Sequence, residues 1–272
     1  MARVAVKPIT LLLFGCFVIT AHPVRAQSFG GSVLNSSTGN TDTATAFFSL
    51  ATGTATYLQI TLTNTSTFSN YLNPDLLSGL FFSIATNPTI TPSSASSPAA
   101  LVNPQACASS AVTLCTTGPV NVGNQWGYVF SATGFSSTAF STKAQYGVAA
   151  PGYSTLTPSF GQPTPFGTNP PNLAAKGTPQ LAFSLVGSAY NAGTSSISSS
   201  DPLLQNSIVF GFGLPSSITS LNVSNVTFAY GTAPDGFSAG TIPEPSSLAV
   251  FGTLLAFLGI ARIRLKPRPS FI

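Results

Sequence analysis

The chain has 272 residues, of which 9 are Lys or Arg and 5 are Asp or Glu, so 5% carry a formal charge. Soluble domains usually carry about 25%, and this deficit excludes a charge-rich disordered tail and a helical coil held by ion pairs. The 24 Gly and 22 Pro follow no three-residue period, which excludes collagen. An all-β protein that acts outside the cytosol remains.

The first 26 residues form a predicted signal peptide. Two cations begin it, residues 9–19 are apolar, and Val24 and Ala26 are the small residues that precede a cleavage site. We expect cleavage between Ala26 and Gln27. A retained membrane helix is disfavoured because about 11 apolar residues do not cross ~30 Å of hydrocarbon. A lipoprotein form, cleaved before Cys16, is the weaker alternative.

Cleavage there leaves a body with no histidine and two cysteines, Cys107 and Cys115. In an oxidising compartment we expect these two to form a disulfide. In the chain-entropy model so short a loop contributes about 2–3 kcal/mol. A metal-binding pair is the alternative, but the body offers no His and no second Cys pair, so we expect no metal at these cysteines. No cofactor is predicted, and calcium is the one alternative left open.

Residues 27–241 form the predicted extracellular domain, a single jelly-roll-like β-sandwich between the signal-peptide helix and a short C-terminal membrane helix. Residues 56–63 carry the clearest alternation, with Leu58, Ile60 and Leu62 on one side. In residues 218–230 the apolar positions change parity, which predicts a bulge near Ser224 and Asn225. Further strands are expected at residues 44–51, 80–85, 126–132, 181–186 and 207–212. Proline and small residues predict loops at 86–104 and 150–179.

The C-terminal segment, residues 242–272, holds three features in order. Pro243, Glu244 and Pro245 come first, and an apolar run at 248–261 lies within a predicted transmembrane helix over 247–263. The run is about 14 residues, or ~21 Å as a helix, and flanking arginines can snorkel. Four cations follow and place that end in the cytoplasm: Arg262, Arg264, Lys266 and Arg268.

This arrangement resembles the PEP-CTERM sorting domain of Gram-negative bacteria, also named the ice-binding protein C-terminal domain. The matching residues are the motif 243–245, the helix and the basic cluster 262–268. The resemblance implies recognition by an exosortase, a membrane enzyme that cuts near the motif and passes the protein to the cell surface or extracellular matrix. Such proteins are often linked to exopolysaccharide and biofilm.

Catalytic residues are scarce in the body. Without His, no Ser-His-Asp or Cys-His site forms, and three of the four aspartates, Asp75, Asp201 and Asp235, sit beside Pro or Gly in turns. Between residues 27 and 241 there are two lysines and four aspartates, a formal charge of −2, so no nucleic-acid partner is expected. Calcium bound by Asp and Asn oxygens stays open.

The sequence therefore predicts a non-enzymatic surface or matrix protein with no catalytic residue. A carbohydrate- or ice-binding module is the alternative, because Thr43 and Thr45, and likewise Thr61 and Thr63, fall on one face of a strand. An enzyme that uses carboxylates alone is the third. It requires two Asp side chains within about 5–10 Å in one cleft.

Overall fold

The computed structural model is an all-β protein, which confirms the predicted fold class. Eighteen strands and one short 3₁₀ helix, η1 (Asn73–Asp75), form the regular structure of the described residues. The structure describes residues 26–52, 55–99, 101–102, 119–123, 125–136, 141–150, 164–166, 182–197, 202–231, 235–238 and 240–242. The predicted signal-peptide and transmembrane helices lie outside these residues.

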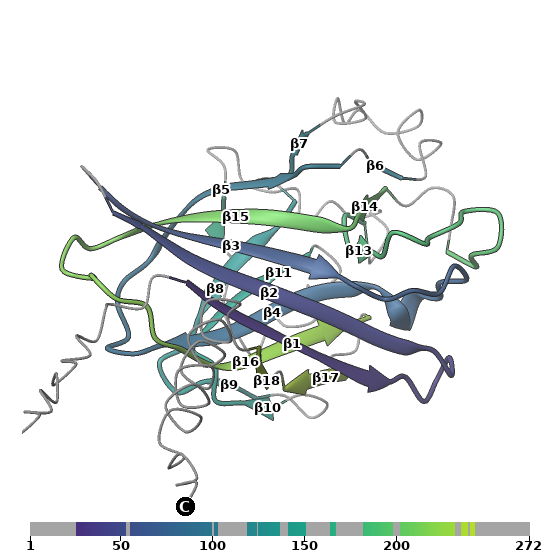
Figure 1. Ribbon diagram of the computed structural model, residues 1–272, viewed down its shortest axis with the longest axis horizontal. Coiled ribbons are helices and arrows are strands. Elements are labelled where there is room, and N and C mark those ends of the chain that lie inside the picture. Colours follow the sequence, from purple (N-terminus) through teal and green to yellow (C-terminus); the bar gives the residue numbers. More distant parts are fainter. Residues whose placement is uncertain are drawn as a thin grey trace, which may run out of the picture.

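One sheet has seven strands and lies in front in Figure 1. Its first three strands in the chain, β1 to β3, are antiparallel neighbours because short turns join them. The spatial order is β18 (Gly240–Ile242), β1 (Ala26–Leu34), β2 (Thr41–Thr52), β3 (Thr56–Asn64), β15 (Ser207–Leu214), β5 (Thr91–Ser97) and β7 (Val120–Asn121).

The second sheet has nine strands and is arranged around β4 (Leu77–Ile84), which is buried along its whole length. Strand β16 (Val223–Tyr230) pairs with β4 and with β17 (Asp235–Ser238). The other strands follow the order β12 (Thr164–Pro165), β8 (Gly127–Phe130), β11 (Tyr146–Ala149), β4, β13 (Leu185–Val186), β14 (Leu203–Gln205) and β6 (Leu101–Val102). A separate pair is formed by β9 (Phe135–Ser136) and β10 (Ser141–Thr142).

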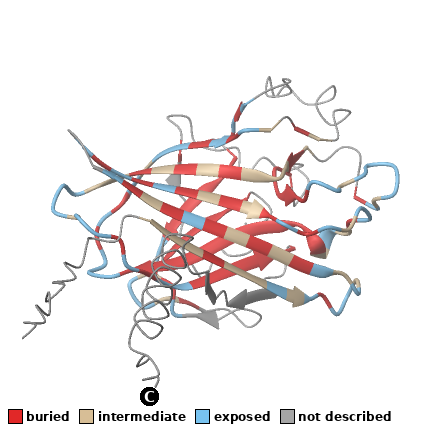
Figure 2. Ribbon diagram, in the orientation of Figure 1, coloured by how far each residue is buried: buried red, intermediate tan, exposed pale blue. Residues whose placement is uncertain are grey.

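Side chains from both sheets share one apolar core. Phe48 of β2 contacts Phe82 of β4 edge-on, with ring centroids 5.2 Å apart. Trp126 packs against Phe210 of β15 at 5.2 Å, and its indole nitrogen donates to a buried backbone carbonyl. Buried and exposed residues alternate along the front strands in Figure 2, as expected for strands with one face on a core.

Most of the predicted strands are present in the structure, and the agreement is best where apolar and polar residues alternate most clearly. Strand β3 covers residues 56–64, and Leu58, Ile60 and Leu62 are fully buried. The bulge is also confirmed, because the pairing of β16 with β4 shifts between Ser224 and Thr227, and Asn225 has a φ of 50°. The strand expected over 181–186 is shorter and covers only β13.

Two stretches differ from the prediction. Residues 86–104 were expected to be a loop, but β5 lies within them and pairs with β15 inside the seven-stranded sheet. This strand was missed because its sequence is mostly Ser, Pro and Thr, with only Ala95 and Ser97 buried. Strand β1 was also not predicted, since Phe29 is its one buried side chain. Of the loop expected at 150–179, Ala150 and residues 164–166 are described, and Thr164 and Pro165 form β12.

Candidate functional site

The two ends of the described domain lie side by side. In β1 and β18, Ser28 is opposite Ile242, Phe29 is opposite Thr241 and Gly30 is opposite Gly240. The strands are antiparallel, so Ile242 at the end of β18 lies near the start of β1. Strands β1 and β18 contain Ala26 and Ile242, the residues next to the two predicted limits of the body, residues 27–241.

The predicted cleavage bond lies at the first peptide of β1. Ala26 pairs with Ser49 and Gln27 with Phe48 of β2. The side-chain oxygen of Gln27 also accepts a hydrogen bond from the backbone N–H of Val223 at 2.6 Å. This residue thus links the start of the seven-stranded sheet to β16 of the other sheet.

The remaining predicted site residues lie outside the described part of the chain. These are the sorting motif at 243–245, the basic cluster at 262–268, and Cys107 and Cys115. Within the described ranges no helix is long and apolar enough to cross a membrane. The motif begins one residue after Ile242, so its attachment point is the end of β18.

Asp75 is a fully buried acceptor with four donors around it. Its Oδ1 accepts from the Asn35 amide at 3.1 Å and from the Thr38 hydroxyl at 2.6 Å. Its Oδ2 accepts from the Asn40 amide at 2.9 Å and from the backbone N–H of Leu72 at 3.0 Å. These bonds match the acceptor capacity of an ionised carboxylate, and they join the turn after β1 to η1.

Asp42 lies beside this network and is satisfied much less well. It is 1% exposed, and its Oδ2 accepts from the same Asn35 nitrogen at 3.2 Å. Its Oδ1 is buried with no hydrogen-bond partner among the described residues. Burial raises the pKa of Asp42 from 3.8 to about 7, the Asn35 bond lowers that pKa, and the charge of Asp75 raises it. Asp42 therefore holds a proton under mildly acidic conditions.

The two aspartates meet the distance criterion for a carboxylate enzyme but not the cleft criterion. The side-chain nitrogen of Asn35 donates to an oxygen of Asp42 and to an oxygen of Asp75. These two oxygens are therefore no farther apart than the combined length of the two hydrogen bonds. Both side chains are buried, with exposures of 0% for Asp75 and 1% for Asp42. A substrate cannot reach either in this conformation. Among the described residues no group of three His, Cys, Asp or Glu side chains is placed to hold a metal.

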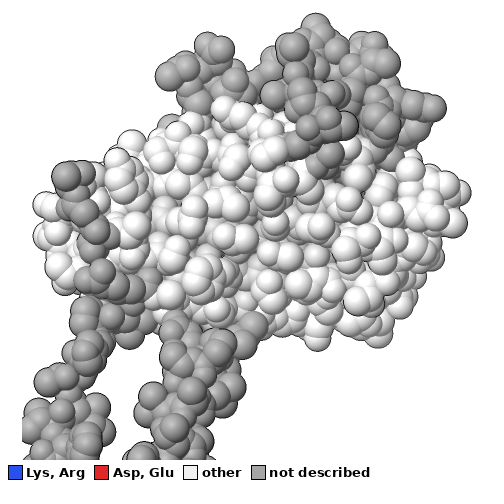
Figure 3. Space-filling model, turned by 45° about the horizontal axis from the view of Figure 1, so that its top comes forward, with Lys and Arg blue, Asp and Glu red and all other residues white. Residues whose placement is uncertain are grey.

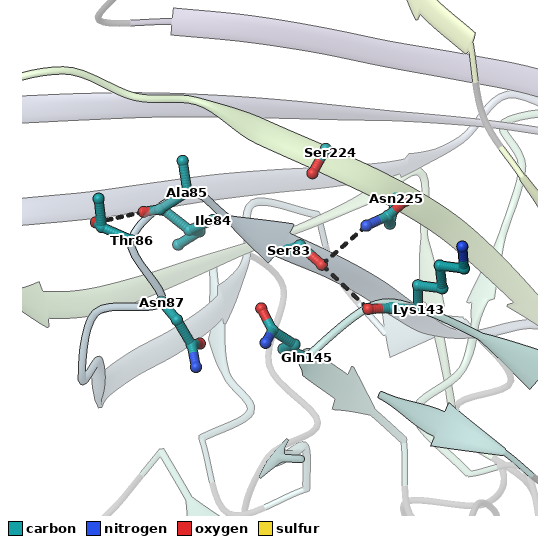
Figure 4. Close-up of a pocket in the computed structure, with 9 residues that line it drawn as sticks. All are labelled: Ser83, Ile84, Ala85, Thr86, Asn87, Lys143, Gln145, Ser224 and Asn225. Carbon is teal, nitrogen blue, oxygen red and sulfur yellow. Dashed lines mark hydrogen bonds between the residues drawn. The ribbon is translucent and has the colours of Figure 1, made fainter. Parts of the chain in front are cut away.

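A polar pocket of about 410 Å³ opens where β4 ends, between β11 and β16. Its walls are residues 83–87, Lys143 and Gln145, and the bulge residues Ser224 and Asn225. Figure 4 shows these side chains, which come from three segments far apart in the sequence. None of the nine described lining residues is acidic.

Hydrogen bonds fix the pocket wall. The Asn225 amide donates to the Ser83 hydroxyl at 3.3 Å, and that hydroxyl donates to the backbone oxygen of Lys143 at 3.4 Å. The Tyr146 hydroxyl lies 2.7 Å from the side-chain oxygen of Asn87. Sequence reasoning did not find this pocket; its only local signal was the bulge predicted at 224–225.

The outer face of the seven-stranded sheet carries the threonines that the sequence analysis singled out. Thr45 of β2 is directly opposite Thr63 of β3, and Phe47 is opposite Thr61. Phe47 is 44% exposed, whereas the threonines are partly buried. In the view of Figure 3 no described residue at the surface is Lys, Arg, Asp or Glu.

Comparison with known proteins adds no relative. Neither a protein-family model, nor a curated protein, nor a solved structure matches the chain.

Because the two buried aspartates are hydrogen-bonded unequally, we predict that the free energy of unfolding depends on pH. The folded state binds the Asp42 proton more tightly than the unfolded chain does. The contribution of Asp42 to the free energy of unfolding is therefore full below about pH 4 and is lost as the pH rises to about 7. The slope reaches about 1.4 kcal/mol per pH unit. Asp42→Asn, which stays neutral, should remove this slope and raise the free energy of unfolding at about pH 8.

Urea unfolding of the wild type and the variant at about pH 5 and about pH 8 measures the effect. Asp75→Asn is the matched control and should destabilise the protein at both values, because an amide cannot accept the four bonds that the Asp75 carboxylate accepts. An unchanged pH slope in Asp42→Asn would show that Asp42 does not hold the proton.

Proposed function

We propose that this protein is an exported, non-enzymatic surface or matrix protein that an exosortase sorts through residues 243–245. The observation that supports the proposal is the pairing of β1 with β18, in which Ser28, two residues after Ala26, is opposite Ile242, the residue before Pro243. The predicted export signal ends and the predicted sorting signal begins next to these paired residues, which suits attachment to a single membrane.

The order of the signals supports the same function. An export signal precedes the domain, and a Pro-Glu-Pro motif, an apolar run and four cations follow it. The two prolines hold the motif extended, and Glu244 keeps it at the water boundary, since burial of its charge in lipid is costly. The protein is first anchored through the helix at 247–263 and then reaches the cell surface or matrix.

The domain itself is proposed to be a β-sandwich. Phe48 and Phe82 join the two sheets across the shared core, and Tyr128 and Phe212 do so at 5.6 Å. A sandwich presents two outer faces and the loops at its ends to solvent, which suits a protein that binds matrix material. Because β1, β2 and β3 are sequential neighbours, this part is a meander; the jelly-roll detail of the prediction stays a prediction.

Replacement of Pro243, Glu244 and Pro245 by Ala should abolish sorting. The substituted protein should accumulate in the membrane with its tail attached, because the enzyme no longer finds an extended, singly charged segment. Cell fractionation and the intact mass of the protein measure this. Pro215→Ala, at an exposed turn, is the control and should be processed normally. Equal processing of both variants would refute the sorting proposal.

A second candidate function is a carbohydrate- or ice-binding module that uses the outer sheet face. The paired Thr45 and Thr63 and the uncharged view in Figure 3 favour it, since regularly spaced hydroxyls can order water or bind sugar hydroxyls. Thr45→Lys and Thr63→Lys should each abolish thermal hysteresis or binding to a neutral-glycan array. If the wild type is inactive in both assays, this candidate is excluded.

A further inference from the structure

The pocket at the end of β4 is formed by four strand residues and by five residues of the adjoining turns and loops. Strand β4 pairs with β11 on one side and with β16 on the other, so its last residues, Ser83 and Ile84, form the floor between two flanking strands. Lys143 and Gln145 come from the approach to β11, and Ser224 and Asn225 come from the bulge of β16. The sheet fixes the strand residues of the wall, and the Ser83 hydroxyl joins them to the backbone of Lys143.

The backbone around the pocket adopts an unfavourable conformation. Five non-glycine residues of the described chain have a positive φ, and three of them line this pocket: Thr86 at 69°, Asn87 at 47° and Asn225 at 50°. Such residues persist only where the surrounding structure fixes them, and they cluster at ligand sites. A positive φ is unfavourable for a β-branched residue such as threonine. The surrounding structure therefore stabilises the turn at Thr86.

The lining side chains combine one positive charge with several uncharged hydrogen-bonding groups. Lys143 is exposed, and it is the single Lys or Arg in the described residues. Asn87, Gln145 and Asn225 contribute amides, and Ser83 and Ser224 contribute hydroxyls. An ammonium binds a carboxylate as a point charge, whereas amides both donate to and accept from hydroxyl groups.

We propose that this pocket binds an acidic saccharide unit of the uronate type. Lys143 pairs with the carboxylate, and the amides of Asn87, Gln145 and Asn225 bind the ring hydroxyls. The proposal rests on the surface function proposed above and deepens it by naming the chemistry of the partner. A neutral saccharide would leave the charge of Lys143 without a counter-charge, and a simple anion such as phosphate would leave the acceptor oxygens of the three amides without a donor.

Binding of the full chain, purified in a neutral detergent, to alginate oligomers tests this proposal, with dextran as the uncharged comparison. Lys143→Gln should weaken alginate binding about threefold, the size of an exposed ion pair, and should remove its salt dependence. Lys143→Arg should retain binding. Asn225→Gly, which keeps the left-handed backbone but loses the amide, should weaken binding about fivefold.

Gln59→Ala is the control, because Gln59 is exposed on β3 and does not line the pocket. It should bind alginate as the wild type does, and urea unfolding of every variant confirms that it is folded. Absence of alginate binding, equal binding by Lys143→Gln, or equally tight binding to dextran overturns the proposal. Processing at residues 243–245 is measured separately in cells, so failure of this proposal and failure of the sorting proposal are distinguishable.

Discussion

The position of β1 between β2 and β18 is the constraint on which the rest depends. Over its nine residues β1 pairs with β2, and three of those residues also pair with β18. Residues 28–30 of β1 are therefore paired on both edges, so this part of the strand is interior to the sheet. The last described strand is thereby fixed against the first, over the pairs from Ser28–Ile242 to Gly30–Gly240.

The hairpin formed by β1 and β2 also contributes buried polar side chains. After β1 the chain turns through Asn35 to Asn40 and enters β2 at Thr41, which places Asp42 and Asp75 on the two sides of one Asn35 amide. Asp75 is fully hydrogen-bonded, whereas Asp42 keeps one oxygen without a hydrogen bond in the described structure. Because the chain has few Lys and Arg side chains, the buried carboxylate of Asp42 is neutralised by binding a proton.

Sequence patterns predicted the strands whose apolar side chains alternate along the chain. Alternating Leu58, Ile60 and Leu62 identified β3, and the change of parity around Ser224 identified the bulge. Strand β5 carries almost no apolar pattern, because backbone pairing with β15 defines it, and it was missed.

The candidate sites were less predictable, because contacts distant in sequence build them. Asp75 was interpreted as a turn residue, and it does end η1, but its partner Asn35 is 40 positions away. The pocket likewise joins residues near 85, 144 and 225. Composition and alternation predicted the all-β fold, whereas the positions of these polar side chains depend on contacts made by the tertiary fold.

A cross-link between β1 and β18 tests the central constraint most directly. In a chain with its three native cysteines replaced by Ser, Ser28→Cys and Ile242→Cys should form a disulfide on mild oxidation. Directly opposed strand residues lie about 4.5–5.5 Å apart at Cα, within disulfide range. Leu34→Cys with Ile242→Cys, at the far end of β1, should stay reduced. Two free thiols in the Ser28–Ile242 variant would contradict the account.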